Sequence, residues 1–344
     1  MSTSPVRFAV CGFGHIGKRH ATMVLRNPEC QLVAAIDPDA AQHAAAATQF
    51  NIPAYGDMAS YLATGPEADV ICIASPNSSH AALAIEALKA GRHVVIEKPM
   101  GLSKADCEEV IFTALNAHKL VFCVMQNRYS PPSAWLKEVV SSGRLGKIFT
   151  VQVNCYWNRD ARYYKPGNWK GSMETDGGTL YTQFSHFVDI MFWLFGDIKN
   201  VQSRFYDFNH QSQTQFEDSG LVSFDFVKGG AGTLNFSTAV WDANLESSIT
   251  IVGEKGSIKV GGQYMNQVDY CHIEGYQMPE LAEASPANDY GHYKGSAANH
   301  HFVIENVVDT LRGRTIATTN ALEGMKVVEI IEKIYNAGVR PVKG

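Results

Sequence analysis

The stretch Val6–Gly17 reads Val-Arg-Phe-Ala-Val-Cys-Gly-Phe-Gly-His-Ile-Gly, and it decides the fold of the first part of the chain. Its first six residues are mostly apolar and predict a buried strand. Gly12, Gly14 and Gly17 follow in the G-x-G-x-x-G spacing, and the residues after them can continue as a helix. A strand, a glycine turn and a helix in this order are typical of dinucleotide binding, because glycines allow the tight turn and the close approach of backbone to a pyrophosphate.

An acidic residue follows this turn at the distance expected for a ribose contact. A second predicted strand, residues 31–36, is followed by Asp37, which lies 20 positions after Gly17. A carboxylate there accepts hydrogen bonds from the adenosine ribose hydroxyls and repels a 2′-phosphate, which favours NAD over NADP. The N–H groups at the helix start, at His15 and Ile16, are expected to bind the phosphates. We therefore predict NAD as the cofactor.

Apolar strands and helix-like runs alternate over the rest of residues 1–125. This order predicts a parallel, doubly wound sheet, whose ligands lie beyond the carboxyl ends of its strands. The loops 75–80 and 97–99 follow two predicted strands and are expected at the same crevice as Gly12. The further predicted cofactor contacts are Ser75, Pro76, Asn77, His80, Glu97 and Lys98. Lysine is usually solvated, but the place of Lys98 at a strand end favours a function in the site.

The bulk properties exclude several classes of protein. The chain has 344 residues, which predicts two domains, 1–125 for NAD binding and 126–344 for substrate binding and oligomerisation. A net charge of -5 argues against nucleic-acid binding and against a polybasic membrane surface. No apolar stretch is long enough to span a membrane, and the N-terminus does not resemble a signal peptide. Seven scattered cysteines without a C-x-x-C motif favour a reduced, cytoplasmic setting.

The second half of the chain contains several half-buried strand patterns, with a helix near 135–141 and another over 321–335. Lys228-Gly229-Gly230 predicts a hairpin turn and hence antiparallel pairing. The predicted strands are 148–156, 201–206, 220–226, 232–239 and 247–252.

A helix with a broad apolar face is predicted over residues 179–195. Thr182, His186 and Asp189 are spaced i, i+4 and i+7 and would lie along one stripe of this helix. One interpretation makes His186 a satisfied core histidine with Asp189 as its partner. The other makes His186 catalytic, and the preceding Asp176-Gly177-Gly178 turn favours it.

The segment 157–170 combines basic and aromatic side chains. Its arginines could be ordinary surface charges, but arginine also binds carboxylates and phosphates bidentately, and aromatic planes pack against sugar faces. Arg159, Tyr163 and Trp169 are therefore candidates for contacts with an anionic sugar nucleotide. His292, His300 and His301 lack the carboxylate or cysteine spacing of a metal site, so we predict none.

These motifs together resemble the Gfo/Idh/MocA oxidoreductases. The resemblance rests on residues 9–20, 75–80, Glu97-Lys98-Pro99, 177–189 and 250–256, and it covers nearly the whole chain except about 265–300. It implies a second, α+β domain with an open, mostly antiparallel sheet and a substrate held between the domains. It also implies that Lys98 and His186 act on a substrate hydroxyl, that the Lys98–Pro99 bond is cis, and that the chain forms a homodimer or homotetramer.

A narrower resemblance points to the UDP-N-acetylglucosaminuronate (UDP-GlcNAcA) 3-dehydrogenases. It rests on 126–128, 157–159, 163–164, 169–171 and 176–178, and it implies that Asn127 and Arg128 bind the substrate. Many family members carry an aspartate where this chain has Thr182, a departure that argues against an inositol-dehydrogenase-like Asp–His pair and fits the uronate subgroup. The implied 3-keto product would pass to a PLP-dependent aminotransferase in polysaccharide biosynthesis.

The mechanism that follows is oxidation of a sugar hydroxyl, with NAD accepting a hydride. His186 is the expected base, and Lys98 would stabilise the developing alkoxide. Two alternatives remain open at this point: an inositol or simple hexose dehydrogenase of the same family, and a non-catalytic NAD-binding regulator. The exact sugar, the reaction direction and the release of NADH are not determined by the sequence.

Overall fold

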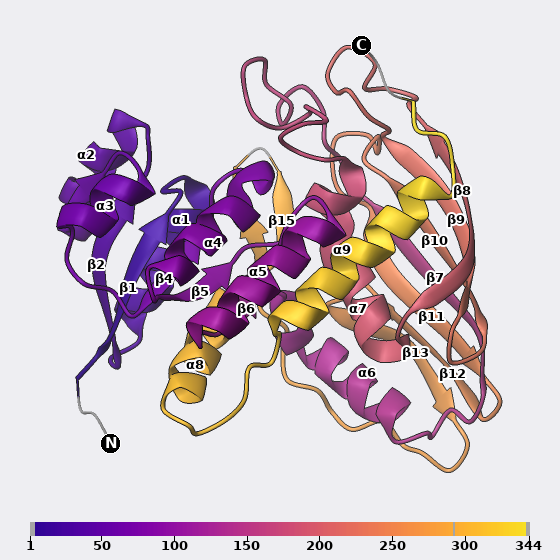
Figure 1. The fold of residues 1–344 in the computed structure, drawn as a ribbon. Coiled ribbons are helices and arrows are strands. Elements are labelled where there is room, and N and C mark those ends of the chain that lie inside the picture. The colour runs from indigo at the N-terminus through magenta and orange to yellow at the C-terminus, as the bar shows by residue number, and fades with distance from the viewer. Residues whose placement is uncertain (1–3, 292, 342–344) are drawn as a thin grey trace. The chain divides into compact units, whose positions relative to one another are not determined.

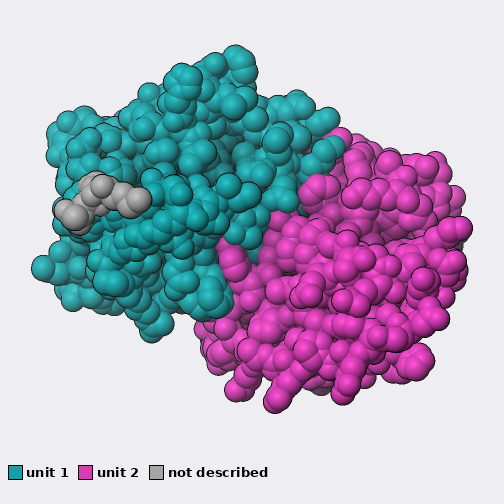
Figure 2. All heavy atoms as spheres, turned by 90° about the horizontal axis from the view of Figure 1, so that it is seen from below, with its two compact units in different colours: residues 1–125, 300–328 teal, residues 126–299, 329–344 magenta. Residues whose placement is uncertain are grey.

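The computed structural model describes residues 4–291 and 293–341, and it divides into two compact units (Figures 1 and 2). The first comprises residues 1–125 and 300–328, and the second comprises 126–299 and 329–344. The chain first passes from one unit to the other after residue 125. The sequence placed the whole of 126–344 in one domain, whereas the structure returns 300–328 to the first unit.

The first unit is built on a six-stranded parallel sheet in the order β3-β2-β1-β4-β5-β6, which confirms the predicted doubly wound fold. The short β3 and α3 were not predicted, because a two-residue strand carries no periodic pattern. The strands are β1 (Val6–Cys11), β2 (Cys30–Ile36), β3 (Ala54–Tyr55), β4 (Val70–Ile73), β5 (His93–Ile96) and β6 (Val121–Cys123). The helices are α1 (His15–Arg26), α2 (Ala40–Phe50), α3 (Met58–Thr64), the 3₁₀ turn η1 (Asn77–Ser79), α4 (His80–Lys89) and α5 (Lys104–Ala117).

Two helices from the last part of the chain belong wholly or partly to this unit. Helix α8 (His300–Leu311) packs against α1 and buries Val303, Ile304 and Val307, so its apolar face explains why this segment belongs with the first unit. Helix α9 (Ala321–Asn336) begins in the first unit and ends in the second, and it matches the helix predicted over 321–335.

The second unit is built on a seven-stranded sheet in the order β13-β12-β11-β7-β10-β9-β8. Only the β10–β7 pair is parallel among the described pairs, so the predicted mostly antiparallel sheet is confirmed. Gly229 and Gly230, with φ of 102° and 88°, turn the chain between β9 and β10. The strands are β7 (Ile148–Tyr156), β8 (Ile198–Tyr206), β9 (Ser219–Phe226), β10 (Ala231–Ser237), β11 (Glu246–Gly253), β12 (Gly256–Gly261) and β13 (Gln267–Ile273), with a separate hairpin of β14 (Ala287–Asp289) and β15 (Lys294–Ala297).

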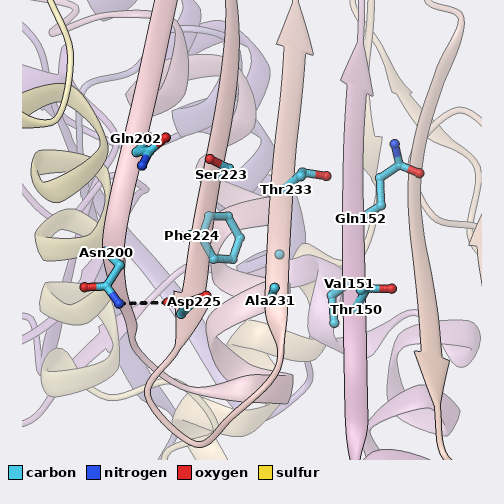
Figure 3. A pocket seen from close by; sticks show the side chains of 11 residues that line it. Thr150, Val151, Gln152, Asn200, Gln202, Ser223, Phe224, Asp225, Ala231 and Thr233 are labelled. Atoms are coloured by element: carbon cyan, nitrogen blue, oxygen red, sulfur yellow. Dashed lines mark hydrogen bonds between the residues drawn. The ribbon is translucent and has the colours of Figure 1, made fainter.

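One face of this sheet is packed, and the other contains a shallow pocket. Along β7, Val151, Val153 and Cys155 are buried, whereas Thr150 and Gln152 are exposed, as the two-residue period of a strand requires. Figure 3 shows the outer face, where a shallow pocket is lined mostly by polar side chains from β7, β8, β9 and β10. Helix α6 (Pro131–Ser141) contacts α7, which in turn contacts β7.

The predicted helix over 179–195 is not a continuous α-helix. Leu180–Phe184 forms a π-helical turn, and α7 (Ser185–Phe195) follows it. A π turn accommodates an extra residue and so shifts the side chains before it relative to those after it. The single stripe expected for Thr182, His186 and Asp189 is therefore interrupted.

The start of this π turn is held by a buried carboxylate. Glu217 accepts hydrogen bonds from the Thr179 N–H at 3.2 Å and from the Tyr335 hydroxyl at 2.6 Å. The same hydroxyl accepts the Leu180 N–H at 2.9 Å, and Arg340 donates to Glu217 at 3.0 Å. The chain end beyond α9 is thus fixed against the segment that leads to His186.

Two absences concern the described part of the chain. All seven cysteines lie in it, and none of them forms a disulfide bond. No helix within residues 4–291 and 293–341 combines the length and apolarity needed to cross a membrane.

Candidate functional site

The glycine turn after β1 leaves no room for side chains at two positions. A Cβ at Gly12, where φ is 85°, would lie 2.4 Å from the Ser75 nitrogen. A Cβ at Gly17 would lie 1.9 Å from the Gly12 carbonyl oxygen. The first glycine therefore lets the turn approach the end of β4, and the other lets α1 pack closely on the turn.

The N-terminus of α1 fits a pyrophosphate. Gly14 is the exposed N-cap residue of α1. Because glycine has no side chain, it does not cap the first N–H groups of the helix, which include those of His15 and Ile16. Asp37 follows β2 and accepts the Phe13 N–H at 2.6 Å, which holds its carboxylate beside the glycine turn. The N–H groups at a helix start, next to a carboxylate, suit the phosphates and the ribose of NAD.

The loop after β4 is tied to the segment after β5 by His80. One ring nitrogen of His80 lies 2.7 Å from the Pro99 carbonyl oxygen, and the other lies 2.8 Å from the Ser75 carbonyl oxygen. The ring is 1% exposed, and this burial lowers the pKa of His80. The structure thus places His80 between two loops, while Pro76 lies half-buried and Asn77 lies buried in the same loop as Ser75.

Lys98 follows β5 and is half-buried, and its peptide bond to Pro99 is cis. Its backbone N–H donates to the neighbouring Glu97 carboxylate at 3.2 Å. Glu97 itself is 6% exposed, and its side chain is held among buried histidines of the same unit.

In the second unit, His186 occupies the first turn of α7 and is 3% exposed. The side-chain nitrogen of Gln126 lies 3.1 Å from His186 Nε2. An amide nitrogen can only donate, so Nε2 is the acceptor and carries the lone pair. A general base needs a lone pair directed at its proton source, and this contact orients one.

The helix that carries His186 is anchored by a buried ion pair. Arg128 donates to the two carboxylate oxygens of Asp189 at 2.9 Å and 2.5 Å, and both side chains are 1% exposed. The guanidinium also lies 5.2 Å from the centre of the Trp193 ring. The structure therefore brings together Arg128, a predicted site residue, and Asp189, which the sequence places three residues after His186.

Thr182 lies in the π turn and contacts the buried carboxylate of Asp176, which lies six residues earlier in the sequence. Its hydroxyl donates to Asp176 Oδ1, and Asp176 Oδ2 accepts the Gly171 N–H at 2.9 Å. Asp176 is 0% exposed. Although residue 182 is not an aspartate, its hydroxyl is hydrogen-bonded to one.

Arg159 is a buried cation whose hydrogen bonds, within the described chain, all reach uncharged oxygens. It is 1% exposed, and it donates to Gln183 Oε1 at 2.7 Å and to the carbonyl oxygens of Asn158 and Lys294 at 2.6 Å and 3.1 Å. Burial lowers the pKa of Arg159. Three aromatic rings surround the guanidinium at 4.8 to 5.2 Å, namely those of Trp157, Tyr163 and Tyr293.

The other predicted substrate contacts lie around these groups. Tyr163 is buried, its hydroxyl accepts a hydrogen bond from Gln183 at 2.7 Å, and the Lys170 ammonium lies 4.0 Å from its ring centre. Trp169 is half-buried. Asn127 is buried and accepts the Ser296 hydroxyl at 2.5 Å.

Comparison with known families decides what this pair of units is. Residues 6–125 match the family model described as "Oxidoreductase family, NAD-binding Rossmann fold". Residues 137–340 match "Oxidoreductase family, C-terminal alpha/beta domain". The chain belongs to the Gfo/Idh/MocA oxidoreductase family. It is therefore an NAD-dependent oxidoreductase, and the family and cofactor predicted from its motifs are confirmed.

Individual members of the Gfo/Idh/MocA family match over nearly the whole chain. The WlbA dehydrogenase from Bordetella pertussis, solved in complex with NADH and UDP-GlcNAcA, is 30% identical with a TM-score of 0.87, covering 99% of each chain. The WlbA dehydrogenase from Chromobacterium violaceum, solved with the same two ligands, is 30% identical with a TM-score of 0.87 over 98% of this chain and 94% of the other. The D-glucoside 3-dehydrogenase of Escherichia coli is 24% identical over 98% of this chain and 96% of its own.

The Gfo/Idh/MocA chain also contains functional candidates that sequence reasoning did not select. His20, Gln126 and Asp176 lie in stretches that carry the family resemblance, but they were not predicted as site residues, because no spacing rule connects their side chains to Glu97, His186 or Thr182. They become candidates only because the fold buries them against these groups.

Within residues 4–291 and 293–341, His20, Glu97 and His300 are a group with the residue types of a metal site. Two ligands of one tetrahedral zinc ion stand about 3.3 Å apart, given zinc–ligand distances near 2.0–2.1 Å. The 2.8 Å contact between His20 Nε2 and Glu97 Oε1 is a hydrogen-bond distance instead. The geometry therefore favours a shared proton at this position.

Proposed function

We propose that this oxidoreductase converts a secondary hydroxyl of a sugar to a ketone, at C3 of a UDP-linked N-acetylated uronic acid. The observation that carries the proposal is the 30% identity over 99% of both chains to a WlbA dehydrogenase solved with NADH and UDP-GlcNAcA. The buried cationic and aromatic cluster around Arg159 supports an anionic sugar as the substrate.

His186 is the proposed base. Its Nε2 accepts a hydrogen bond from Gln126, so the nitrogen that carries the lone pair is already oriented. The substrate hydroxyl would take the place of the amide donor and transfer its proton to Nε2 as the C–O bond becomes a carbonyl. Proton removal by a positioned base contributes about 10²- to 10⁴-fold to such a rate. When bound, NAD supplies the acceptor for the hydride that leaves the same carbon.

Lys98 is the proposed stabiliser of the developing negative charge. An ammonium group near the forming alkoxide lowers the energy of the transition state more than that of the neutral alcohol. The residues proposed to hold NAD are those of the glycine turn with Asp37, and the loops that carry Ser75 and Glu97 complete that site. Asn127, Tyr163, Trp169 and Thr182 are proposed substrate contacts.

The anionic character of the substrate has a physical basis in the second unit. A buried guanidinium that donates only to neutral oxygens keeps its full positive charge in a medium of low dielectric constant. A uronate carboxylate or a diphosphate would provide the opposite charge. Inositol and simple hexoses offer no such charge, so this observation does not favour them.

A panel of substrates tests the proposal. NADH formation is measured with UDP-GlcNAcA, with neutral UDP-GlcNAc, and with myo-inositol and glucose. We expect turnover with the uronate and much less with the neutral compounds. Equal or faster turnover of inositol or glucose would show that the chain is a dehydrogenase of neutral sugars, and NAD binding without any turnover would favour a non-catalytic regulator.

The outer face of the second unit's sheet supports assembly into a homodimer or homotetramer. Leu221, Val252 and Tyr270 are 52%, 39% and 54% exposed, and they add apolar area to a face that a second copy of the chain would cover. Light scattering after size exclusion is expected to give a mass of at least two chains.

The ketone that this reaction forms is the substrate that a PLP-dependent aminotransferase requires. We therefore propose that such an enzyme consumes the product. Cytoplasmic localisation is a further part of the proposal, supported by seven cysteines that form no disulfide bond within the described chain.

A further inference from the structure

Three buried side chains from separate parts of the first unit meet beside Lys98. His20 comes from α1, Glu97 follows β5, and His300 opens α8. The Glu97 Oε1 atom lies 2.8 Å from His20 Nε2 and 3.5 Å from His300 Nε2. The two imidazole rings meet edge to face at 5.6 Å, and the three residues are 0%, 6% and 2% exposed.

The contacts define the charge of this His20–Glu97–His300 cluster. Glu97 accepts from both imidazoles and, through Oε2, from the Lys98 N–H at 3.2 Å. Burial alone would raise the pKa of Glu97, but the hydrogen bonds from His20 and His300 outweigh burial and hold it well below its usual value. Burial lowers the pKa of His300, so this ring donates as neutral imidazole. Glu97 is therefore an ionised carboxylate inside the protein.

The backbone that follows Lys98 is also contacted by a buried histidine. His80 lies 2.7 Å from the Pro99 carbonyl oxygen, so a buried imidazole contacts the chain immediately after Lys98. Arg19 of α1, Cys72 of β4 and Lys98 itself also interact electrostatically with the cluster or with His80. Lys98 thus lies on a segment fixed on both sides by buried histidines.

We propose that His20, Glu97 and His300 are positioning residues for Lys98, which fix the backbone that carries the ammonium and place a permanent negative charge next to it. The inference rests on the proposed role of Lys98 in sugar oxidation. A nearby carboxylate favours the protonated amine, which is the form that stabilises an alkoxide. It also assigns α8, a segment from the end of the chain, a part in the proposed site.

The charge is tested without any sugar by measuring how the acetylation of Lys98 depends on pH, with mass spectrometry of the peptide that contains it. In Glu97→Gln, we expect the labelling midpoint to move to lower pH by about one unit, because a carboxylate that favours the ammonium is lost. His301→Leu removes a histidine next to the cluster but outside it, and it is expected to label as the wild type does. An unchanged midpoint in folded Glu97→Gln would overturn the proposal.

Positioning is tested by the length of the donor at residue 300. His300→Leu removes the donor, and we expect kcat to fall on the order of tenfold with the Kd for NAD unchanged. His300→Gln keeps an N–H donor of similar reach and is expected to recover most of the lost activity. Equal losses in the two folded variants would contradict the positioning role.

These readouts separate the inference from the proposed function. If no sugar is oxidised, the proposed function fails, while the acetylation midpoint still decides the effect of Glu97 on Lys98. Metal analysis of the purified protein adds an independent check. Zinc bound at one ion per chain and lost in His20→Leu would show that the cluster holds a metal instead of a proton, and it would overturn the proposal.

Discussion

At the scale of single residues, the second unit concentrates its unusual chemistry around two side chains, His186 and Arg159. His186 is held by an amide donor that fixes its lone pair, and Arg159 is buried among aromatic rings and neutral oxygens. A buried arginine normally requires a carboxylate or another anion. The absence of a carboxylate among its hydrogen-bond partners in the described chain is the reason for assigning it an anionic ligand.

Substitution of Arg159 tests this assignment. Arg159→Lys keeps the charge but loses the planar fork, and Arg159→Met loses both. For UDP-GlcNAcA, we expect KM to rise about ten- to a hundredfold in Arg159→Met and less in Arg159→Lys, since a hydrogen bond to a charged group contributes about 1.5–3 kcal/mol. The KM for NAD is the internal control. An unchanged KM for the uronate would restrict Arg159 to a structural role.

Residue types and spacing predicted the cofactor turn well because its parts are local. Gly12, Gly17 and Asp37 lie within one strand–helix–strand unit, so the chain order itself brings them together. The partners of His186 and Glu97 come from distant segments, and no periodicity connects Gln126 with residue 186 or His20 with residue 300. Those pairs depend on tertiary structure.

At the scale of elements, the segment that carries His186 shows where pattern reasoning ends. The i, i+4, i+7 spacing predicted one helical stripe, but Leu180–Phe184 forms a π turn. The turn is hydrogen-bonded through Thr182 to Asp176, six residues earlier, and the residue before it, Thr179, donates to Glu217 from a distant segment. The contact with Glu217 depends on tertiary structure and is not visible in the local sequence. The strands β12 to β15 were missed for a different reason, because they are short or polar and interrupted by glycines.

The ion pair between Arg128 and Asp189 is expected to stabilise this helix strongly. Asp189→Asn leaves a buried arginine without its partner, and we expect the free energy of unfolding to fall by about 3–5 kcal/mol. Denaturant unfolding measures this loss. The exposed pair of Arg162 and Asp242 is the matched control, and Asp242→Asn is expected to leave stability nearly unchanged. Similar effects of the two substitutions would contradict the assigned role of burial.

At the scale of the whole molecule, the sequence predicted the fold class of each of the two units, but it did not predict which segments of the chain each unit contains. The parallel and antiparallel sheets follow from strand–helix alternation and from hairpin turns. The return of 300–328 to the first unit was not predicted, although the spacing of Val303, Val307 and Val308 on α8 carries an amphipathic signal that could have identified the helix.

Buried histidines make the stability of the molecule depend on pH. Burial lowers the pKa of His80 and His300, and it lowers the pKa of His93 to about 4. Their pKa in the unfolded chain is near 6.5, so the unfolded state binds more protons between about pH 4 and 6.5. Stability from these groups is complete above about pH 6.5 and is lost as the pH falls. Burial also lowers the pKa of His210. Burial raises the pKa of Glu217, which acts in the opposite direction, but this is one group against four histidines.

We therefore expect the melting temperature to fall as the pH is lowered from about 7 to about 5. His93→Asn should reduce this dependence, whereas substitution of the exposed His118 to Asn should leave it unchanged. Differential scanning calorimetry over this range measures both. A melting temperature that rises toward pH 5 would contradict the assignment of these histidines as buried and neutral.

The most direct test of the proposed chemistry is a single-turnover reaction of the protein with NAD and UDP-GlcNAcA, read by NADH absorbance and by mass spectrometry of the sugar. We expect one ketone, two hydrogens lighter than the substrate, for each NADH formed. In Lys98→Met and His186→Asn the rate should fall by about 10²- to 10⁴-fold while NAD still binds, and in the surface variant Lys89→Met it should be unchanged. Wild-type rates in both site variants, or NADH formed without loss of hydrogen from the sugar, would contradict the roles assigned to Lys98 and His186.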